Sequence, residues 1–293
     1  MSTHPRGAPP PTNPPPVRVP PLLRDLVDDA AVFPPGSATL PDAVAAHLRH
    51  RSAWYAPMVG PLLLPPSDVD GLAPLLAGED ALTVAVVGPL AQVLRAVEAV
   101  TAAGRVTLAH VESPVSKRGE DPLPGLRVLL STGLRGYAEI PLTLGLLAAL
   151  DELARAWHEG AQLAPKFRTG GLAAELFPSP IELAAVICAC RDRELPFKLT
   201  AGLHHAIRRT EPETGFVHHG FLNVLAAALQ AAAGAEPDAV AETVAGTDPV
   251  PLVEAVRAAL DRPRPLWNGF GSCSIVEPLA DLQQLGLLAS EAA

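Results

Sequence analysis

Four short segments of the chain carry polar side chains two residues apart. The pairs are His110 with Glu112, Tyr137 with Glu139, Lys166 with Arg168, and Lys198 with Thr200. Residues two apart on a β-strand share one face, so each pair projects to one side of its segment. Amines, carboxylates and a guanidinium on one wall can transfer protons, form an imine with a carbonyl compound and bind an anion.

The two lysines have the most specific chemistry of this set. Lys166 and Lys198 repel one another and Arg168, and burial disfavours their ammonium forms, so we expect one lysine to have a lowered pKa. A neutral amine attacks a carbonyl carbon or removes a proton next to one. We therefore expect Lys198 and Lys166 to be catalytic, with Glu139 and Glu112 carrying protons. Three residues are assigned to substrate binding: Arg168, Tyr137 and Thr200.

A long segment after Lys198 holds four of the nine histidines, at positions 204, 205, 218 and 219. We expect His204 to act as a general acid or base, and His205 and His219 to contact substrate. Asn223 is expected to contact substrate or to cap the following helix. We expect no cofactor. A divalent metal is the weaker alternative, because neither H-x-H nor H-E-x-x-H spacing occurs here.

Two glycine-rich turns are candidates for holding an anion through backbone N–H groups. Gly170 and Gly171 follow Arg168, and the turn GFGSCS precedes the last helical segment. We assign Gly170, Gly171, Gly271 and Ser272 to substrate binding.

The elements that position these groups alternate in type along the chain. Short apolar segments predict strands at 54–64, 81–88, 105–112, 135–142, 164–171, 196–202, 240–246 and 265–274. Helical patterns of 10–15 residues separate most of them, and this alternation is typical of a parallel sheet. Eight such units in about 240 residues fit an α/β fold of the (β/α)8 TIM-barrel type, with its catalytic groups at the C-terminal ends of the strands. An open doubly wound sheet is the alternative.

The start of the chain is expected to differ from the rest. Residues 1–21 are rich in proline and predict a disordered tail, and residues 22–293 predict a single barrel domain. Amphipathic patterns at 22–29 and 41–51 predict an N-terminal helical extension.

A structural alternative for the polar pairs is an internal salt-bridge network that only fixes the register of the barrel.

Composition excludes several classes of protein. The 293 residues carry a formal net charge of −9, which argues against a nucleic-acid partner. The sequence has no apolar run of the roughly 20 residues that a membrane span needs. Three cysteines predict no disulfide framework, and no signal peptide is recognised, so we expect a cytoplasmic location. A small anionic substrate is the expected partner, and the apolar helices are compatible with a homodimer.

The segment PFKLTAG, with Lys198, Thr200 and Gly202, resembles the Schiff-base strand of deoxyribose-phosphate aldolase and other class I barrel aldolases. In that family the reactive lysine lies on the sixth strand, within a K-T/S-x-T/A-G pattern. The resemblance implies that Lys198 forms an imine and that Lys166 perturbs it. The sequence departs from the family because its second lysine falls on the fifth predicted strand rather than the seventh, and no acidic relay residue aligns.

A second resemblance covers more of the chain. The segments KFRTGG, KLTAGLHH, HHGFLN and FGSCS are together similar to an uncharacterised bacterial barrel family of actinobacterial type, which implies no activity. The leading interpretation is an aldolase-like carbon–carbon lyase acting on a small anionic carbonyl compound through a lysine imine. The alternatives are an enolising isomerase or racemase, a metal-dependent hydrolase, and a catalytically silent ligand-binding barrel.

Overall fold

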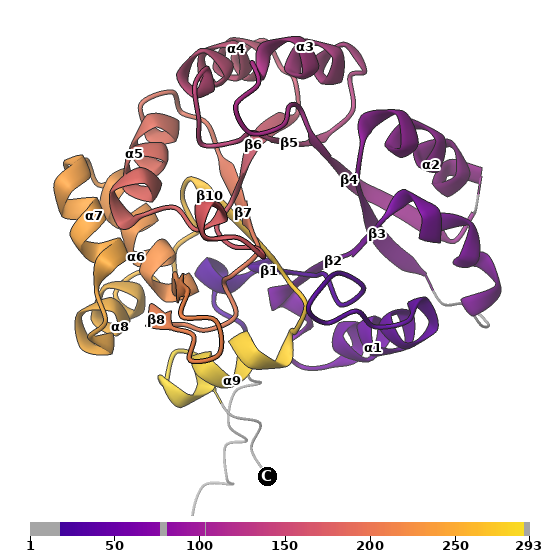
Figure 1. Cartoon of the computed structure of the whole chain (residues 1–293). Helices are drawn as coiled ribbons and strands as arrows, with labels where there is room; N and C mark the ends of the chain where they lie inside the picture. The colour runs from indigo at the N-terminus through magenta and orange to yellow at the C-terminus, as the bar shows by residue number, and fades with distance from the viewer. Residues whose placement is uncertain (1–17, 77–80, 103, 290–293) are drawn as a thin grey trace, which may run out of the picture.

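Eight parallel strands close into a barrel in the order β1-β10-β7-β6-β5-β4-β3-β2 (Figure 1). The computed structural model describes residues 18–76, 81–102 and 104–289. The barrel strands are β1 (Val27–Asp29), β2 (Val59–Leu64), β3 (Leu82–Val87), β4 (Val106–Pro114), β5 (Gly136–Glu139), β6 (Leu163–Arg168), β7 (Phe197–Thr200) and β10 (Trp267–Ser272). The expected (β/α)8 TIM-type barrel is confirmed.

Helices surround the barrel and cover the outer face of its strands (Figure 1). The α-helices are α1 (Leu40–Ser52), α2 (Leu90–Ala102), α3 (Leu123–Ser131), α4 (Leu146–His158), α5 (Pro180–Arg191), α6 (Phe221–Ala232), α7 (Pro237–Ala245), α8 (Pro249–Arg257) and α9 (Val276–Gln284). Short 3-10 helices lie at Pro21–Leu23, Ala56–Met58, Pro66–Gly71, Ala73–Leu75 and Ala174–Leu176. Among the described residues, no helix combines the length and apolar character of a membrane span.

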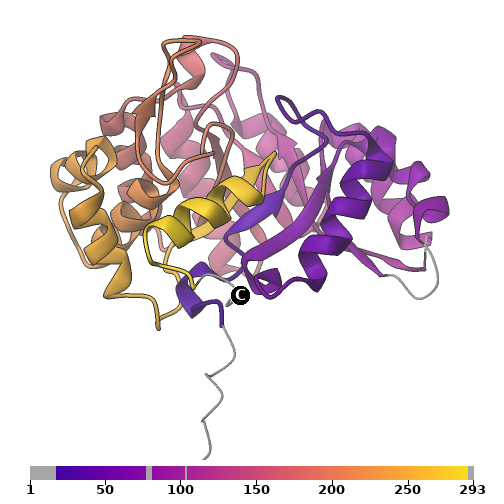
Figure 2. The same cartoon turned by 90° about the horizontal axis from the view of Figure 1, so that it is seen from below.

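The segments after β6 and β7 project together at one end of the barrel, at the top of Figure 2. The segment after β7 contains a small antiparallel hairpin of β8 (Arg209–Thr210) and β9 (Val217–His218). Phe177 joins the two segments, because its ring lies 4.8 Å from that of Phe216 and 4.9 Å from that of His218. These segments therefore cover part of the C-terminal mouth.

The expected helix at 22–29 is wrong. Only Pro21–Leu23 forms a 3-10 turn, and the chain then enters β1, which lies between β10 and β2. The Leu26 backbone N–H donates to the carbonyl of Met58 at 3.0 Å, and the Leu26 carbonyl accepts from Phe270 at 3.0 Å. Pairing with two distant strands overrides the local helical pattern.

The expected strand at 240–246 is also wrong, because these residues belong to α7. Pro237 occupies the first turn of this helix, where its missing N–H costs no hydrogen bond. Val240 and Val244 are four residues apart and both are buried, which is the spacing of one helix face. Because β1 replaces this strand in the barrel, Lys166 lies on the sixth barrel strand and Lys198 on the seventh.

The two faces of the strands differ in character. Phe167, Phe197, Leu199 and Phe270 are buried in the core between barrel and helices, while the polar pairs occupy the opposite face.

Of the expected tail, residues 1–17 lie outside the described residues. Val19 is 3% exposed, so the packed part of the chain begins before residue 22.

Gly269 permits the close approach of β10 to the chain entering β1. Its φ is +117°, and an added Cβ would lie 2.4 Å from the carbonyl oxygen of Leu26. We predict that Gly269→Ala lowers the free energy of unfolding by about 3 kcal/mol, because backbone strain and overpacking combine. Gly133→Ala is the matched control, since Gly133 also has a positive φ but an added Cβ meets no atom within 4 Å. We expect it to cost about 1 kcal/mol. Equal losses in urea denaturation would contradict the assignment.

Candidate functional site

Glu112 on β4 lies at the centre of the barrel between the two expected catalytic lysines. Its Oε2 accepts from the Nζ of Lys166 on β6 at 2.7 Å, and its Oε1 accepts from the Nζ of Lys198 on β7. The three residues are only 1–2% exposed. The structure therefore brings both amines together inside the barrel, with one carboxylate between them.

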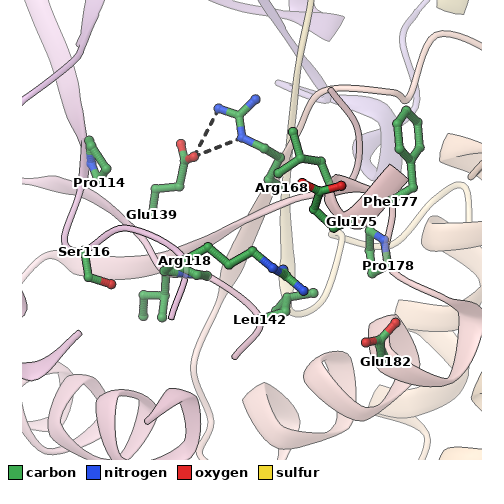
Figure 3. Close-up of a pocket in the computed structure, with 13 residues that line it drawn as sticks. Pro114, Ser116, Arg118, Glu139, Leu142, Arg168, Glu175, Phe177, Pro178 and Glu182 are labelled. Atoms are coloured by element: carbon green, nitrogen blue, oxygen red, sulfur yellow. Dashed lines mark hydrogen bonds and ion pairs between the residues drawn. The ribbon is translucent and has the colours of Figure 1, made fainter. Parts of the chain in front are cut away.

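Further ion pairs extend this centre in both directions. Lys166 Nζ also lies 2.7 Å from Glu139 Oε2, and Glu139 Oε1 accepts from Nε and Nη2 of Arg168 at 3.1 Å each (Figure 3). Lys198 also donates to the carboxylate of Asp28 on β1. We call this chain of alternating acids and bases the interior charge network: Asp28, Lys198, Glu112, Lys166, Glu139 and Arg168.

Two members of this centre were not among the predicted site residues. Asp28 belongs to the segment that the sequence predicted as helix, and the signal that could have found it is a pair of acids directly after the apolar Leu26 and Val27. His110 was recognised as the partner of Glu112 on one strand face but was given no role. Its Nε2 lies 3.0 Å from Glu112 Oε1, 3.7 Å from Asp28 Oδ2 and 3.4 Å from Lys198 Nζ.

The expected lowering of a lysine pKa is wrong. Burial is the largest influence on both amines and alone would lower the pKa of each. The carboxylates of Glu112 and Glu139 outweigh it for Lys166, and those of Asp28 and Glu112 outweigh it for Lys198, so both lysine pKa values are raised. The mutual repulsion on which the expectation relied is offset by Glu112 between the amines and by one further acid beside each of them.

The pKa values of the carboxylates are shifted in the opposite direction, below their ordinary values. Burial alone would raise the pKa of Glu112, but the ammonium groups of Lys166 and Lys198 hold it well below its ordinary value. Lys166 and Arg168 likewise lower the pKa of Glu139 against the effect of burial. The shifts of Glu112, Glu139, Lys166 and Lys198 therefore all favour the charged form of the group.

Tyr137 and Thr200 flank the network on the strands that carry it. The ring centroid of Tyr137 lies 5.1 Å from Lys198 Nζ, and its hydroxyl accepts a hydrogen bond from Asn268 Nδ2 at 3.1 Å. Burial raises the pKa of Tyr137, so its hydroxyl keeps its proton. Thr200 lies opposite Arg168 in the register of β6 and β7.

One end of the network lines a cavity of about 260 Å³ at the C-terminal ends of β4, β5 and β6. Glu139 and Arg168 line it as a hydrogen-bonded ion pair (Figure 3). Arg118, after β4, and Glu175, in the 3-10 helix Ala174–Leu176, also line it. Lys166 does not line the cavity itself but contacts Glu139, which does. A ligand in this cavity would meet a guanidinium first, then a carboxylate, then a buried amine.

The loop histidines are not gathered with the network. His204 Nδ1 lies 3.2 Å from Glu277 Oε2, and His205 Nδ1 lies 3.5 Å from Asp281 Oδ2, both acids being on α9. His219 is buried with its Nε2 2.7 Å from the Pro178 carbonyl, and desolvation lowers its pKa to about 4. These contacts give the three histidines separate positions rather than one shared centre.

Asn223 has a structural role in place of the expected cap. It lies inside α6, where its Oδ1 accepts from the Arg208 backbone N–H at 2.9 Å. Its Nδ2 donates to the carbonyls of Thr243 and Gly246 at 2.9 and 2.8 Å. The side chain therefore ties the β7–α6 segment to the end of α7.

The glycines of the two predicted anion-binding turns pack closely against neighbouring protein atoms. An added Cβ would lie 2.9 Å from Gly202 Cα at Gly170, 2.4 Å from Leu176 Cδ1 at Gly171 and 3.0 Å from Leu63 Cδ1 at Gly271. Ser272 Oγ donates to the carbonyl of Ser274 at 2.8 Å. The residues that line the C-terminal cavity include none of these four.

One set of side chains has the composition of a metal site. Single ligand atoms of Asp28, His110 and Glu112 lie within 4.8 Å of one another. The Lys198 ammonium donates to both of these acids and lies 3.4 Å from the His110 nitrogen. An ammonium group thus takes the position, among these donors, that a cation would take.

No protein-family model, no curated protein and no solved structure matches this chain. The class is defined by the fold: a (β/α)8 TIM-type barrel, commonly an enzyme whose catalytic groups lie at the C-terminal ends of the strands. A more specific function has to be inferred from the interior charge network and the cavity beside it.

The network predicts a loss of stability at both extremes of pH. Glu112 and Glu139 titrate below their ordinary 4.5 when folded, so the unfolded chain binds more protons in acid and stability falls below about pH 5. Lys166 and Lys198 titrate above 10.5 when folded, so the unfolded chain loses protons first and stability falls above about pH 10. Urea denaturation across pH checks this, with Glu139→Gln expected to flatten the acid limb. Constant stability from pH 9 to 11 would argue against the network.

Removal of the Lys198 ammonium should convert the donor set into a zinc site. We expect zinc at about 100 times its Kd to stabilise Lys198→Ala by about 3 kcal/mol and to leave the wild type unchanged. Lys117→Ala is the control, because Lys117 is exposed. Breaking a buried ion pair costs about 3–5 kcal/mol, so the variant has to be checked for folding. Tight stoichiometric zinc binding by the wild type would by itself refute the interpretation.

Proposed function

We propose that this barrel is an aldolase-like carbon–carbon lyase that acts on a small anionic carbonyl compound through an imine on Lys166. The observation that carries the proposal is the connection from the buried Lys166 amine through Glu139 to Arg168 at the C-terminal cavity. Lys198 lies deeper, between Asp28 and Glu112. The proposal therefore moves the imine from Lys198, where the sequence resemblance placed it, to Lys166.

The composition of the chain supports a special role for the interior amines. The sequence has three lysines among 22 basic residues, and two of the three are Lys166 and Lys198. A buried arginine could neutralise the same carboxylates, but its guanidinium stays protonated and does not form an imine. In class I barrel aldolases the reactive lysine lies on the sixth strand and the second on the seventh, which are the strands of Lys166 and Lys198, although the motif that carries the resemblance surrounds Lys198.

Arg168 and Arg118 favour an anionic substrate, since guanidinium groups bind carboxylate or phosphate in a bidentate manner. An anion held by Arg168 would also help to deprotonate Lys166. Glu139 lies between the lysine and the cavity, so transfer of a proton from Lys166 to Glu139 moves positive charge toward the anion. The same ligand would draw Arg168 away from Glu139 and remove one cause of its lowered pKa.

The reaction can then proceed with the groups present. Lys166 Nζ attacks the carbonyl carbon, and loss of water leaves a protonated imine. Cleavage of the bond between the α- and β-carbons sends its electron pair into the imine to form an enamine. A carboxylate takes the proton of the β-hydroxyl, whose oxygen becomes the carbonyl of the first product, which is released. Protonation of the enamine and hydrolysis release the second product and restore the amine.

Borohydride trapping tests this proposal on the unmodified protein. Incubation with pyruvate, dihydroxyacetone phosphate or glyceraldehyde 3-phosphate, followed by reduction, should add the mass of the carbonyl compound less one oxygen atom. Peptide mapping should locate the adduct at Lys166, with exposed Lys117 as the internal control for non-specific reaction. Lys166→Met should lose the adduct. Modification of Lys117 alone, or of no lysine with any of a broad panel of carbonyl compounds, would refute the proposal.

A second candidate follows from the raised pKa of both lysines. A protonated Lys166 could stabilise an enolate as an acid while Glu139 removes the proton, which is the chemistry of an enolising isomerase or racemase. This candidate predicts exchange of solvent deuterium into the substrate with no adduct after borohydride. The two mechanisms are therefore separated by one pair of measurements.

A further inference from the structure

A second cavity, of about 490 Å³, lies at the opposite end of the barrel, where the strands begin. Its rim includes Val59 at the start of β2, Trp267 at the start of β10 and Arg135 just before β5. Its floor includes Asp28, His110 and Tyr137, which belong to or contact the interior charge network. This N-terminal recess is separate from the cavity beside Arg168.

Four arginines line the recess, but they differ in how much of their hydrogen-bonding capacity is free. Arg264 donates to five backbone carbonyls, including those of Leu22 and Asn268. Arg51 uses Nη1 for the carbonyls of Ala56 and Val59. Arg24 and Arg135 have no ion-pair or hydrogen-bond partner for their side chains within residues 18–76, 81–102 and 104–289. Two guanidinium groups at the recess are therefore available to a ligand.

The remaining charges of the recess leave it positive. Asp28 is matched by Lys198, so Asp25 is the one further acid among the residues that line it. Burial, the largest influence, and the neighbouring Asp28 raise the pKa of Asp25, while the nearby Arg264, Arg51 and Arg24 act to lower it. Four guanidinium groups against one carboxylate favour an anion of more than one charge.

The Tyr137 hydroxyl on the floor of the recess can donate a hydrogen bond to a ligand. The hydroxyl oxygen of Tyr137 accepts from Asn268, which leaves the hydroxyl hydrogen for another acceptor. A neighbouring cavity of about 560 Å³ shares His110, Arg135, Tyr137 and Asn268 with the recess and continues toward Trp157 and Gln162. A ligand with an anionic group in the recess therefore has room for its remaining atoms beside it.

We propose that the N-terminal recess is a second binding site, which holds a small metabolite with a phosphate or dicarboxylate group through Arg24 and Arg135 above the Tyr137 hydroxyl. Both guanidinium groups line the same cavity, and a guanidinium group binds carboxylate or phosphate oxygens in a bidentate manner. The ligand contacts the network from the side of Asp28 and His110 rather than from Arg168. The site is independent of the proposed lyase chemistry at the other end of the barrel.

Titration calorimetry and thermal shift with inorganic phosphate and with succinate, at constant ionic strength, test this site. We expect one equivalent to bind at the recess, separate from any anion held by Arg168, and we expect Arg135→Gln and Arg24→Gln each to weaken this binding at least tenfold. Arg95→Gln is the matched control, because Arg95 is an exposed arginine on α2. The relative affinity of the two probes identifies whether phosphate or dicarboxylate is preferred.

The variants also separate this site from the catalytic one. Arg168→Gln should leave binding of the probe unchanged, whereas loss of binding in this variant alone would place the anion at the C-terminal cavity and overturn the proposal. Absence of binding of both probes at millimolar concentration would overturn it as well. Arg24 and Arg135 are exposed, so their variants are expected to fold, and the melting temperature without probe checks that they do.

Discussion

One carboxylate held between two buried ammonium groups is the interaction on which the interior of this barrel depends. Glu112, Lys166 and Lys198 would each be strongly destabilising if buried alone. Glu112 is stabilised by both ammonium groups, and each ammonium group is stabilised by Glu112 together with a second acid, Glu139 for Lys166 and Asp28 for Lys198. The register between strands supports this arrangement, since Glu139 lies opposite Lys166 and Lys166 lies opposite Lys198. A shift of any of these strands by one residue would turn its charges toward the apolar core.

The alternating acids and bases of the interior charge network run from one end of the barrel to the other. The network begins at Asp28, close to where the strands start, and ends at Arg168, where β6 ends. Its middle is shielded from water, while each end lines a cavity of its own. A salt-bridge network that served only to fix strand register would not need a partly exposed guanidinium at one end and an acid–imidazole pair lining a cavity at the other. The arrangement therefore fits a functional interior better than a purely structural one.

Much of this could be predicted from the alternation of side chains along individual strands. The polar pairs from Glu112 to Lys198 face inward as expected, because a period of two is a local property of the sequence. β1 was missed because it has three residues, too few to show a period, and it exists through pairing with β10, which lies far away in the chain. The direction of the lysine pKa shifts was missed for a related reason. It depends on Glu112 lying between the amines and on Asp28 lying beside Lys198, and both follow from the closure of the barrel.

The scarcity of lysine has a practical consequence for observing how this protein moves. Lys117 is exposed, whereas Lys198 is 2% exposed and is held between Asp28 and Glu112, away from the C-terminal cavity. Acylation of Lys198 therefore requires local opening of the barrel. The rate at which Lys198 is labelled thus reports how often the β-sheet opens, and the labelling rate of Lys117 in the same molecule gives the reference for an accessible amine.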